Sequence, residues 1–552
     1  MRDMLKLATL IDNPGEPPAQ TQYRDARVLA GLGYNALAIY ETTAFAGIQN
    51  IETIDSAELR NWLVGRAEQI THSIDEAHAA GLGVYFFYDL LALPHDLVQA
   101  DAADLTCRNR PQVLCPASDA AMDLSVAALE TMLARWPAVQ GVVLRFGDTD
   151  ANRLPHLMGN DIYSPHCPRC SHMGPADRII AVLDRFYELV VVRLNKRLIA
   201  RAWNVRPHGL HDSVQLAEQV VPRLPGSSDD PRLMLSFKFT QTDFWRYQKW
   251  NPSSLHCGGR PILYELQCQR EFEGKGGVPN WQAPLWRDGY PETRGQTDAA
   301  GLTALAGKLN IAGLWAWVRG GGWGGPFISN EAWIDANVFA VPRLADDPAI
   351  DMRDLARQWI DQRLNLADDA AVQPLVDLLL DSPEMVRQAF YIAPAARQRS
   401  EPWNPNGGWI QDDLLDAQAA WRLIEKLTDA QLDEAIREKQ AAAEQISRAR
   451  GVIQQTLNNR NQAQLNPLVN TLVYTESLFE MLGDFVTGLA AYRKYQRHHN
   501  PGSAQIARQK LLAAQTCWNH HTQHHGSLPG AATALRQTDF WELTQQILSE
   551  LT

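Results

Sequence analysis

Residues 261–268 read PILYELQC, and residues 269–276 continue with QREFEGKG. The first half is a short apolar run that holds one glutamate, Glu265. The second half is charged, with Glu271 near its start and two glycines at its end. Buried strands of a parallel sheet read as continuous apolar runs of this kind. The stretch is either a strand followed by an ordinary polar loop or a strand that delivers acids to a reaction, and the remainder of the chain decides between them.

Seven further apolar runs recur along the N-terminal part of the chain. They are LKLATLID (5–12), YNALAIYE (34–41), GVYFFYDL (83–90), GVVLRFGD (141–148), RLIARAWN (197–204), LMLSFKFT (233–240) and IAGLWAWV (311–318). Helix-like stretches, such as residues 58–81 and 177–195, lie between most of the runs. Eight buried strands that alternate with helices predict an α/β fold, a (β/α)8 TIM barrel over residues 1–330. A doubly wound open sheet is the alternative. It would be expected to carry a glycine-rich phosphate turn after its first strand, and LATLIDNPGEPPAQ has none.

Beyond residue 330 the pattern changes to apolar residues at helical spacing, without strand-like runs. LLDAQAAWRLIEKL (414–427) and NTLVYTESLFEMLGDFVTGLAAYRKYQ (470–496) show this period. The pattern predicts an all-helical C-terminal domain over residues 331–552.

Composition limits the classes of partner. The chain of 552 residues carries a formal charge of −12, which argues against nucleic acid or an anionic membrane as the main partner, because both need a basic face. No apolar run is long enough for a membrane span. The start, MRDMLKLATLIDNPGE, has no long apolar core and no cleavage site. We therefore expect no signal peptide and a cytoplasmic protein; a periplasmic location stays open if a signal peptide has been removed.

The predicted strand ends carry acids, cations and tryptophans. The fourth run supplies Asp148 and Asp150, the fifth Arg201 and Trp203, the sixth Lys238 and Asp243, the seventh Glu271, and the eighth Trp317 and Arg319, whereas Glu265 lies in the middle of the seventh run. In a TIM barrel these C-terminal strand ends form one face, which carries the active site. Like charges gathered there cost stability unless they serve a function. The sequence therefore predicts a reactive site at this face.

Two carboxyl groups are what glycoside hydrolysis requires, because one protonates the leaving oxygen and the other activates water or attacks the sugar carbon. Arg201 would offer two parallel N–H donors, and Lys238 a compact ammonium charge, to an anionic group such as the carboxylate of a sugar acid. The alternative is that these two cations only neutralise neighbouring acids. Flat indole rings suit the faces of sugars, which makes Trp203 and Trp317 candidate contacts.

KFTQTDFWRYQKWNPSSL (238–255), followed by ELQCQREFEGKG (265–276), resembles the family 67 α-glucuronidases. In that family a lysine precedes a catalytic aspartate in a K-x4-D pattern, here Lys238 and Asp243. The next strand carries E-x-Q-x3-E, here Glu265, Gln267 and Glu271. ARAW (200–203) looks like the segment whose arginine, here Arg201, helps to bind the uronate. Residues 331–360 are similar to the family's passage into its helical domain.

The resemblance implies an inverting hydrolase that removes a uronic acid from a short oligosaccharide, without a cofactor and as a homodimer. Asp243 and Glu271 would be the candidates for the base, and an acid of the fourth strand would protonate the leaving oxygen. We favour Asp148 over Asp150 because it lies closer to the strand end, although the family has a glutamate there. Glu265 would contact a sugar hydroxyl or support the catalytic groups. A barrel hydrolase for a neutral or differently substituted sugar, and a carbohydrate-binding barrel without catalysis, are the alternatives.

HCPRCSH (166–172) places Cys167 and Cys170 two residues apart. A structural zinc needs four ligands, and this motif supplies two cysteines. Cys107 or Cys115 could complete a site. The pattern by itself favours a reduced pair that stabilises a loop, so we expect no metal.

Overall fold

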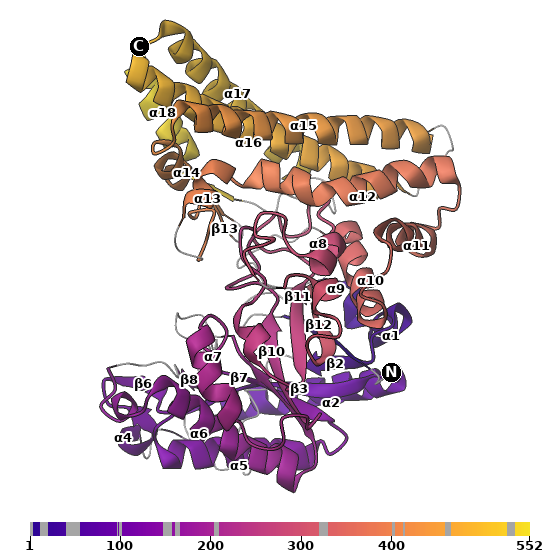
Figure 1. The fold of residues 1–552 in the computed structure, drawn as a ribbon, viewed down its shortest axis with the longest axis vertical. Helices are drawn as coiled ribbons and strands as arrows, with labels where there is room; N and C mark the ends of the chain where they lie inside the picture. Colours follow the sequence, from indigo (N-terminus) through magenta and orange to yellow (C-terminus); the bar gives the residue numbers. More distant parts are fainter. Residues whose placement is uncertain are drawn as a thin grey trace.

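The computed structural model describes residues 4–11, 20–39, 56–95, 98, 102–146, 157–160, 166–203, 209–297, 299–319, 329–399, 403–411, 414–458, 465–526 and 536–551. Eight parallel strands close into a barrel in the order β1-β12-β11-β10-β9-β7-β3-β2. They are β1 (Leu5–Leu10), β2 (Ala36–Ile39), β3 (Gly83–Asp89), β7 (Gly141–Arg145), β9 (Arg197–Arg201), β10 (Leu233–Lys238), β11 (Ile262–Gln267) and β12 (Ile311–Arg319). Each strand falls within or largely on one of the eight apolar runs. The predicted (β/α)8 barrel is confirmed (Figure 1).

Helices follow most of the strands and cover the outside of the barrel. They are α1 (Ala26–Leu32), α2 (Ala57–Ala79), α5 (Asp119–Arg135), α6 (Pro175–Tyr187), α7 (Val214–Val220), α8 (Ala283–Asp288), α9 (Leu302–Leu305) and α10 (Ala332–Asp346). Serines start three of them: Ser56, Ser118 and Ser213 each accept a hydrogen bond from a backbone N–H of the first turn. Such caps satisfy a donor that the helix itself cannot use.

Two insertions interrupt the alternation. The chain after β3 forms β4 (Leu93–Pro94), α4 (Ala102–Leu105), β5 (Thr106–Cys107) and β6 (Arg110–Leu114), and the chain after β7 forms β8 (Leu157–Asn160). These strands join in one small sheet of order β4-β8-β6-β5. The two insertions therefore meet beside the barrel, where Figure 1 shows β6 and β8 near α4 and α6.

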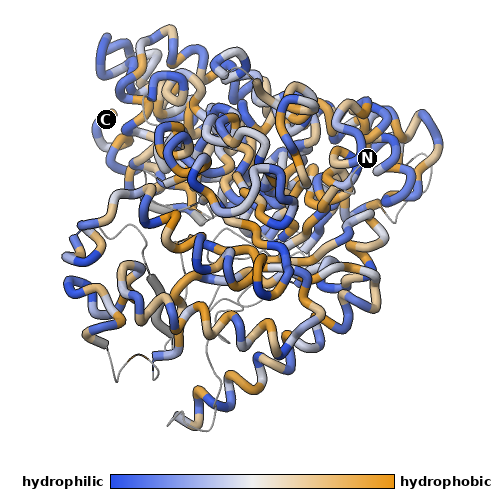
Figure 2. Tube along the Cα trace, turned by 60° about the horizontal axis from the view of Figure 1, so that its bottom comes forward, coloured by the Kyte–Doolittle hydropathy of each residue, from blue (hydrophilic) through white to orange (hydrophobic). Residues whose placement is uncertain are grey.

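The C-terminal region is helical, as predicted. Its helices are α11 (Met352–Leu364), α12 (Asp369–Phe390), α13 (Ala393–Gln398), α14 (Ala417–Ile424), α15 (Asp429–Asn458), α16 (Asn466–His498), α17 (Pro501–Gly526) and α18 (Phe540–Glu550). The sequence pattern did not predict a small sheet of β13 (Ile410–Gln411), β14 (Leu414–Asp416) and β15 (Arg536–Thr538). Along the helices hydrophobic and hydrophilic residues alternate, as one-sided burial requires (Figure 2). No helix among the described residues is long and apolar enough to cross a membrane.

Helix α10 links the barrel to the helical region. It packs on β12 and α1, and Tyr34 donates a hydrogen bond to the carbonyl of Val338 at 2.8 Å. The helix thus takes the place of the last helix of the barrel, although it lies beyond residue 330. The predicted boundary at residue 330 stays a prediction, as does the homodimer.

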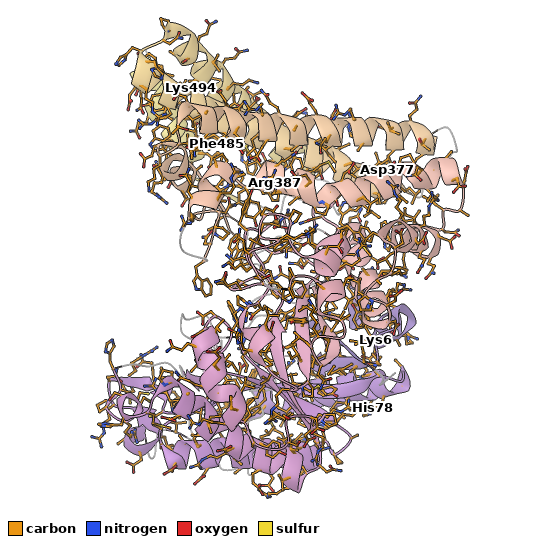
Figure 3. All side chains as sticks on the ribbon, viewed as in Figure 1. Lys6, His78, Asp377, Arg387, Phe485 and Lys494 are labelled. Carbon is orange, nitrogen blue, oxygen red and sulfur yellow. The ribbon has the colours of Figure 1, made fainter. Side chains whose placement is uncertain are left out.

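The helical region also contacts the loops that follow β10 and β11. Arg387 of α12, labelled in Figure 3, donates hydrogen bonds of 2.8 Å to Tyr247 Oη and to Glu438 Oε1 of α15. Tyr391, at the end of α12, donates to Glu273 Oε1 at 2.9 Å. One face of the helical region is therefore joined to the strand-end loops of the barrel.

Barrel closure depends on a glycine. Gly313 of β12 pairs with Leu5 of β1, and a Cβ at position 313 would lie 2.2 Å from the carbonyl oxygen of Leu5. We expect Gly313→Ala to lower the free energy of unfolding by about 1–3 kcal/mol, the usual cost of overpacking. Thermal and urea unfolding followed by circular dichroism measure the effect.

Gly65→Ala in α2 is the matched control. A Cβ there meets no atom within 4 Å, and alanine in a helix is favoured over glycine by about 1 kcal/mol. Equal effects of the two substitutions would contradict the steric argument.

Candidate active site

Charged side chains fill the C-terminal end of the barrel interior, and Arg201 lies at their centre. Its Nε donates to Glu265 Oε1 at 3.0 Å and its Nη2 to Glu265 Oε2 at 2.9 Å. Ser236 of β10, the strand between them, donates to Glu265 Oε1 at 2.6 Å. The Arg201 side chain is 1% exposed and that of Glu265 is 0% exposed. Two charges that are buried in this way are stable only as an ion pair, because an unpaired buried charge is strongly destabilising.

Aromatic rings surround this pair. Arg201 Cζ lies 4.6 Å from the ring centroid of Trp317 and 5.8 Å from those of Phe87 and Trp315. The indole N–H of Trp315 donates to Thr9 Oγ1 at 2.7 Å. Rings from β3 and β12 therefore exclude water from the guanidinium and hold it by cation–π attraction.

Two further cations at the strand ends also face carboxylates. Arg145 at the end of β7 donates from Nη2 to Asp89 Oδ2 of β3 at 2.6 Å. Arg319 at the end of β12 has its Nε 3.5 Å from Glu331 Oε1. Burial lowers the pKa of Arg319, and Glu331 opposes that shift. The charges at this end of the barrel are thus arranged as pairs of opposite sign.

Lys238 at the end of β10 donates a hydrogen bond to Asp243 Oδ1. Its Nζ also lies 3.4 Å from the ring centroid of Trp203 and 4.8 Å from that of Phe244. Asp243 Oδ1 accepts a second bond, at 3.0 Å, from the backbone N–H of Phe244. The Asp243 carboxylate is therefore held by an ammonium and an amide.

Asp243 and Glu271 lie on two loop segments that are joined directly. Arg270 Nη2 donates to the carbonyl of Phe244 at 2.8 Å. The rings of Trp245 and Phe272 stack with centroids 3.8 Å apart and planes 9° apart. The neighbours of the two acids are in contact, so the loops after β10 and β11, which carry Asp243 and Glu271, pack directly against each other.

The acids differ in access to solvent. The side chain of Asp243 is 16% exposed and Glu271 as a whole residue is 9% exposed, whereas Glu265 is fully buried. The backbone N–H of Glu271 donates to Gln267 Oε1 at 3.0 Å, which ties the loop to the end of β11. Asp243 is thus the more exposed of these acids, Glu271 is nearly buried, and the enclosed Glu265 supports Arg201.

Sequence reasoning missed a buried network around Glu273, two residues after Glu271. Glu273 accepts hydrogen bonds from Arg270 Nε (3.0 Å), Asn280 Nδ2 (2.6 Å) and Tyr391 Oη (2.9 Å). Burial raises the pKa of Glu273, but Arg270 and the other donors lower it by more, so the carboxylate stays ionised. Arg270 itself has a φ of 58°, in the left-handed region that non-glycine residues rarely adopt. The sequence shows that Arg270 and Glu273 lie close together in the chain. It does not show that Asn280 of the loop after β11 and Tyr391 at the end of α12 donate hydrogen bonds to Glu273.

Sequence reasoning also missed His211 as a residue that supports the site. Its Nε2 donates to the carbonyl of Thr242 at 2.6 Å and its Nδ1 accepts from Asn251 Nδ2 at 3.1 Å, an assignment that fits a neutral ring. Burial, with help from the charge of Lys238, lowers the pKa of His211 to about 3. Its ring meets the edge of Trp203 with centroids 4.9 Å apart. His211 therefore fixes both the Thr242 turn before Asp243 and the indole beneath Lys238.

The structure brings together most of the predicted site residues. Arg201, Trp203, Lys238, Asp243, Glu265, Glu271, Trp317 and Arg319 all lie at the C-terminal strand ends. Asp148 and Asp150 lie outside the described residues. Arg201 and Lys238 each pair with an acid of the chain, the alternative that the sequence left open. The roles of these residues in binding and catalysis stay predictions.

No protein-family model matches the chain, and neither does a curated protein. Among solved structures, a GH138 enzyme targeting pectin rhamnogalacturonan II is similar over 99% of this chain and 67% of its own, with 11% identity and a TM-score of 0.58. An O-GlcNAc hydrolase of Thermobaculum terrenum aligns over 99% and 94% of the two chains, with 12% identity and a TM-score of 0.42. At these identities the first likeness shows the shared fold, and the second carries no argument. The resemblance to family 67 stays a prediction.

The buried pair provides a stability test. Glu265→Gln leaves Arg201 as an uncompensated buried charge, so we expect the free energy of unfolding to fall by about 3–5 kcal/mol. Denaturant unfolding monitored by circular dichroism measures the loss.

Asp119→Asn is the control, because Asp119 pairs with Arg185 in an exposed position and such pairs contribute less than about 1 kcal/mol. A loss for Glu265→Gln as small as that of the control would show that Arg201 keeps another compensating partner.

Proposed function

We propose that this protein is a glycoside hydrolase that uses Asp243 and Glu271 at the C-terminal end of its barrel. The observation that carries the proposal is that the loops that hold these two acids are joined by a hydrogen bond and a ring stack at the C-terminal end of the barrel. Two carboxyl groups are the minimum that acid–base cleavage of a glycosidic bond needs. The shared fold with a pectin-targeting GH138 enzyme agrees with the proposal.

Asp243 is the preferred base. Lys238 and the backbone amide of Phe244 both donate to its Oδ1, which fixes the position of the carboxyl group, and its side chain is 16% exposed, so water can reach it. In the inverting reaction that we propose, this carboxylate takes a proton from water while the water oxygen bonds to the anomeric carbon. The bond from that carbon to the leaving oxygen breaks, and the leaving oxygen takes a proton from an acid of the β7 loop, Asp148 or Asp150. Glu271 is the alternative base.

The finer proposal is that the sugar removed is a uronic acid on a short oligosaccharide. Lys238 supports this reading, because its ammonium has three N–H donors and lies at the same face as Asp243. Arg201 is enclosed with Glu265, so in this proposal it supports the residues around it and does not bind the sugar carboxylate directly. Trp203 and Trp317 would provide the ring surfaces.

A neutral sugar is the second candidate, and a specific observation favours it. Arg145, Arg201, Lys238 and Arg319 each face a carboxylate of the chain itself. Cations that are already compensated need no acidic substrate to stabilise them. The two candidates share the catalytic carboxylates and differ only in what Lys238 contacts when substrate is bound.

Substitution of the acids tests catalysis. We expect Asp243→Asn and Glu271→Gln each to lower kcat for glycoside hydrolysis by at least about 100-fold, since general acid–base catalysis contributes roughly 10²–10⁴-fold. Release of reducing sugar from a panel of oligosaccharides measures the rate.

Asp288→Asn, which alters the half-buried Asp288 beside Arg287 in α8, is the control and should keep full activity. If the wild type cleaves no glycoside but binds oligosaccharides, the chain is a binding barrel. If it cleaves them and both acid variants keep full rates, the catalytic assignment is wrong.

Paired substrates test the uronate. We expect the wild type to prefer an aldouronic oligosaccharide to its neutral counterpart. We expect Lys238→Met to raise KM for the acidic substrate by roughly tenfold, a contact of about 1.4 kcal/mol, while KM for the neutral one changes little. Equal kcat/KM values on both substrates would remove the uronate and leave the neutral-sugar candidate.

A further inference from the structure

Four buried cysteines meet where the two insertions touch. The two arms of the β5–β6 hairpin supply Cys107 and Cys115, and the turn before α6 supplies Cys167 and Cys170. Their sulfur atoms all lie within 4.8 Å of one another. Two ligand atoms thus come from the insertion after β3 and two from the insertion after β7.

The sulfur distances fit one coordination geometry. Cys115 Sγ lies 3.4 Å from Cys170 Sγ and 3.8 Å from Cys167 Sγ. Four sulfurs placed tetrahedrally at about 2.3 Å from a zinc ion lie about 3.8 Å from one another. A disulfide would require about 2.05 Å, and all seven cysteines of the chain are free. The cluster therefore has the spacing of a tetrathiolate site and not that of two disulfides.

The cluster is also a separate small core. Val113 and the four cysteines form an apolar cluster distinct from the main core of the protein, and Ala117 is the one partly buried apolar residue packed against it in the described part of the chain. The strands that it supports have two to five residues each. A core of this size buries too little apolar surface to order two insertions, and small units of this kind usually depend on a disulfide or a metal.

The surroundings hold the ligands in place. Cys115 donates its backbone N–H to the carbonyl of Leu105 at 2.8 Å, and Ser171 donates to the carbonyl of Cys167 at 2.8 Å. Arg169 Nη1 donates to the carbonyl of Asp104 at 2.6 Å, from one insertion to the other. Arg178 of α6 donates to the carbonyl of Cys170 at 2.5 Å. Two guanidinium groups thus lie beside a site whose four thiolates would leave a net charge of −2 on a bound divalent ion.

We propose that Cys107, Cys115, Cys167 and Cys170 bind one structural zinc ion that joins the insertion after β3 to the insertion after β7. Four protein thiolates fill the tetrahedral coordination sphere, so no position stays open for water or substrate. Binding exchanges the remaining thiol protons for one Zn²⁺. The sequence expectation of a metal-free pair is thereby revised, because the structure adds the two ligands that HCPRCSH lacks.

The metal content of the full-length protein tests the site. Protein purified without chelators or a metal-affinity tag should contain about one zinc per chain by inductively coupled plasma mass spectrometry, because a complete thiolate site holds zinc through purification. The double variant Cys167→Ser/Cys170→Ser should contain at least roughly tenfold less. Cys517→Ser, in α17 and outside the cluster, is the control and should keep its zinc.

Thiol protection tests the same site in the wild type, in case the double variant does not fold. Iodoacetamide should leave the four cysteines unmodified in the native protein and should alkylate them after a strong zinc chelator is added, as peptide mass spectrometry would detect. Wild-type protein without stoichiometric metal would overturn the proposal. Iron in place of zinc, or disulfides among the four residues, would also overturn it. These readouts do not depend on the proposed hydrolase activity.

Discussion

The ion pair between Arg201 and Glu265 is the constraint on which the site depends. Both side chains lie inside the barrel, enclosed by rings from β3 and β12. Neither charge could remain there alone, because an unpaired charge in such surroundings costs several kcal/mol. The pair joins β9 to β11, and Ser236 of β10, the strand between them, also donates to Glu265. The three strands that lead to Trp203, Asp243 and Glu271 are therefore linked by one buried polar group.

The loops after β10 and β11 depend in turn on the helical region. Glu273 is satisfied partly by Tyr391 from the end of α12, and Arg387 reaches Tyr247 of the β10 loop. Long loops at a barrel mouth are usually mobile because few contacts restrain them. Here the helical region supplies such contacts to the loops after β10 and β11.

The barrel could be predicted from the sequence because its strands are buried on both faces. Runs such as LMLSFKFT and PILYELQC stay apolar on both sides of the strand, and their regular spacing indicates the crossover helices. The C-terminal positions of Lys238, Asp243 and Glu271 followed from the same pattern. The pattern could not predict which charged residues form ion pairs with each other. Arg201 and Glu265 are 64 residues apart, and a glutamate in an apolar run does not reveal which cation it will meet.

The same limit applied to the cysteines and to His211. CPRC indicated a pair, but the other two cysteines lie 52 or more residues away along the chain, on an insertion that follows a different strand. His211 lies in an ordinary polar stretch, and only the approach of Thr242 and Asn251 gives its two nitrogens distinct roles. Local patterns record burial well, whereas long-range polar pairing depends on strand order and loop packing.

Pairing of charges at the strand ends has a consequence for specificity. Lys238 already donates to Asp243, so an acidic sugar that contacts the same ammonium would share it with the proposed base. The ammonium has three N–H donors, so it can hold both carboxylates and fix their relative positions. Under the uronate proposal, one cation would therefore couple recognition of the substrate to the placement of the base. A neutral sugar would leave Asp243 as the carboxylate partner of Lys238.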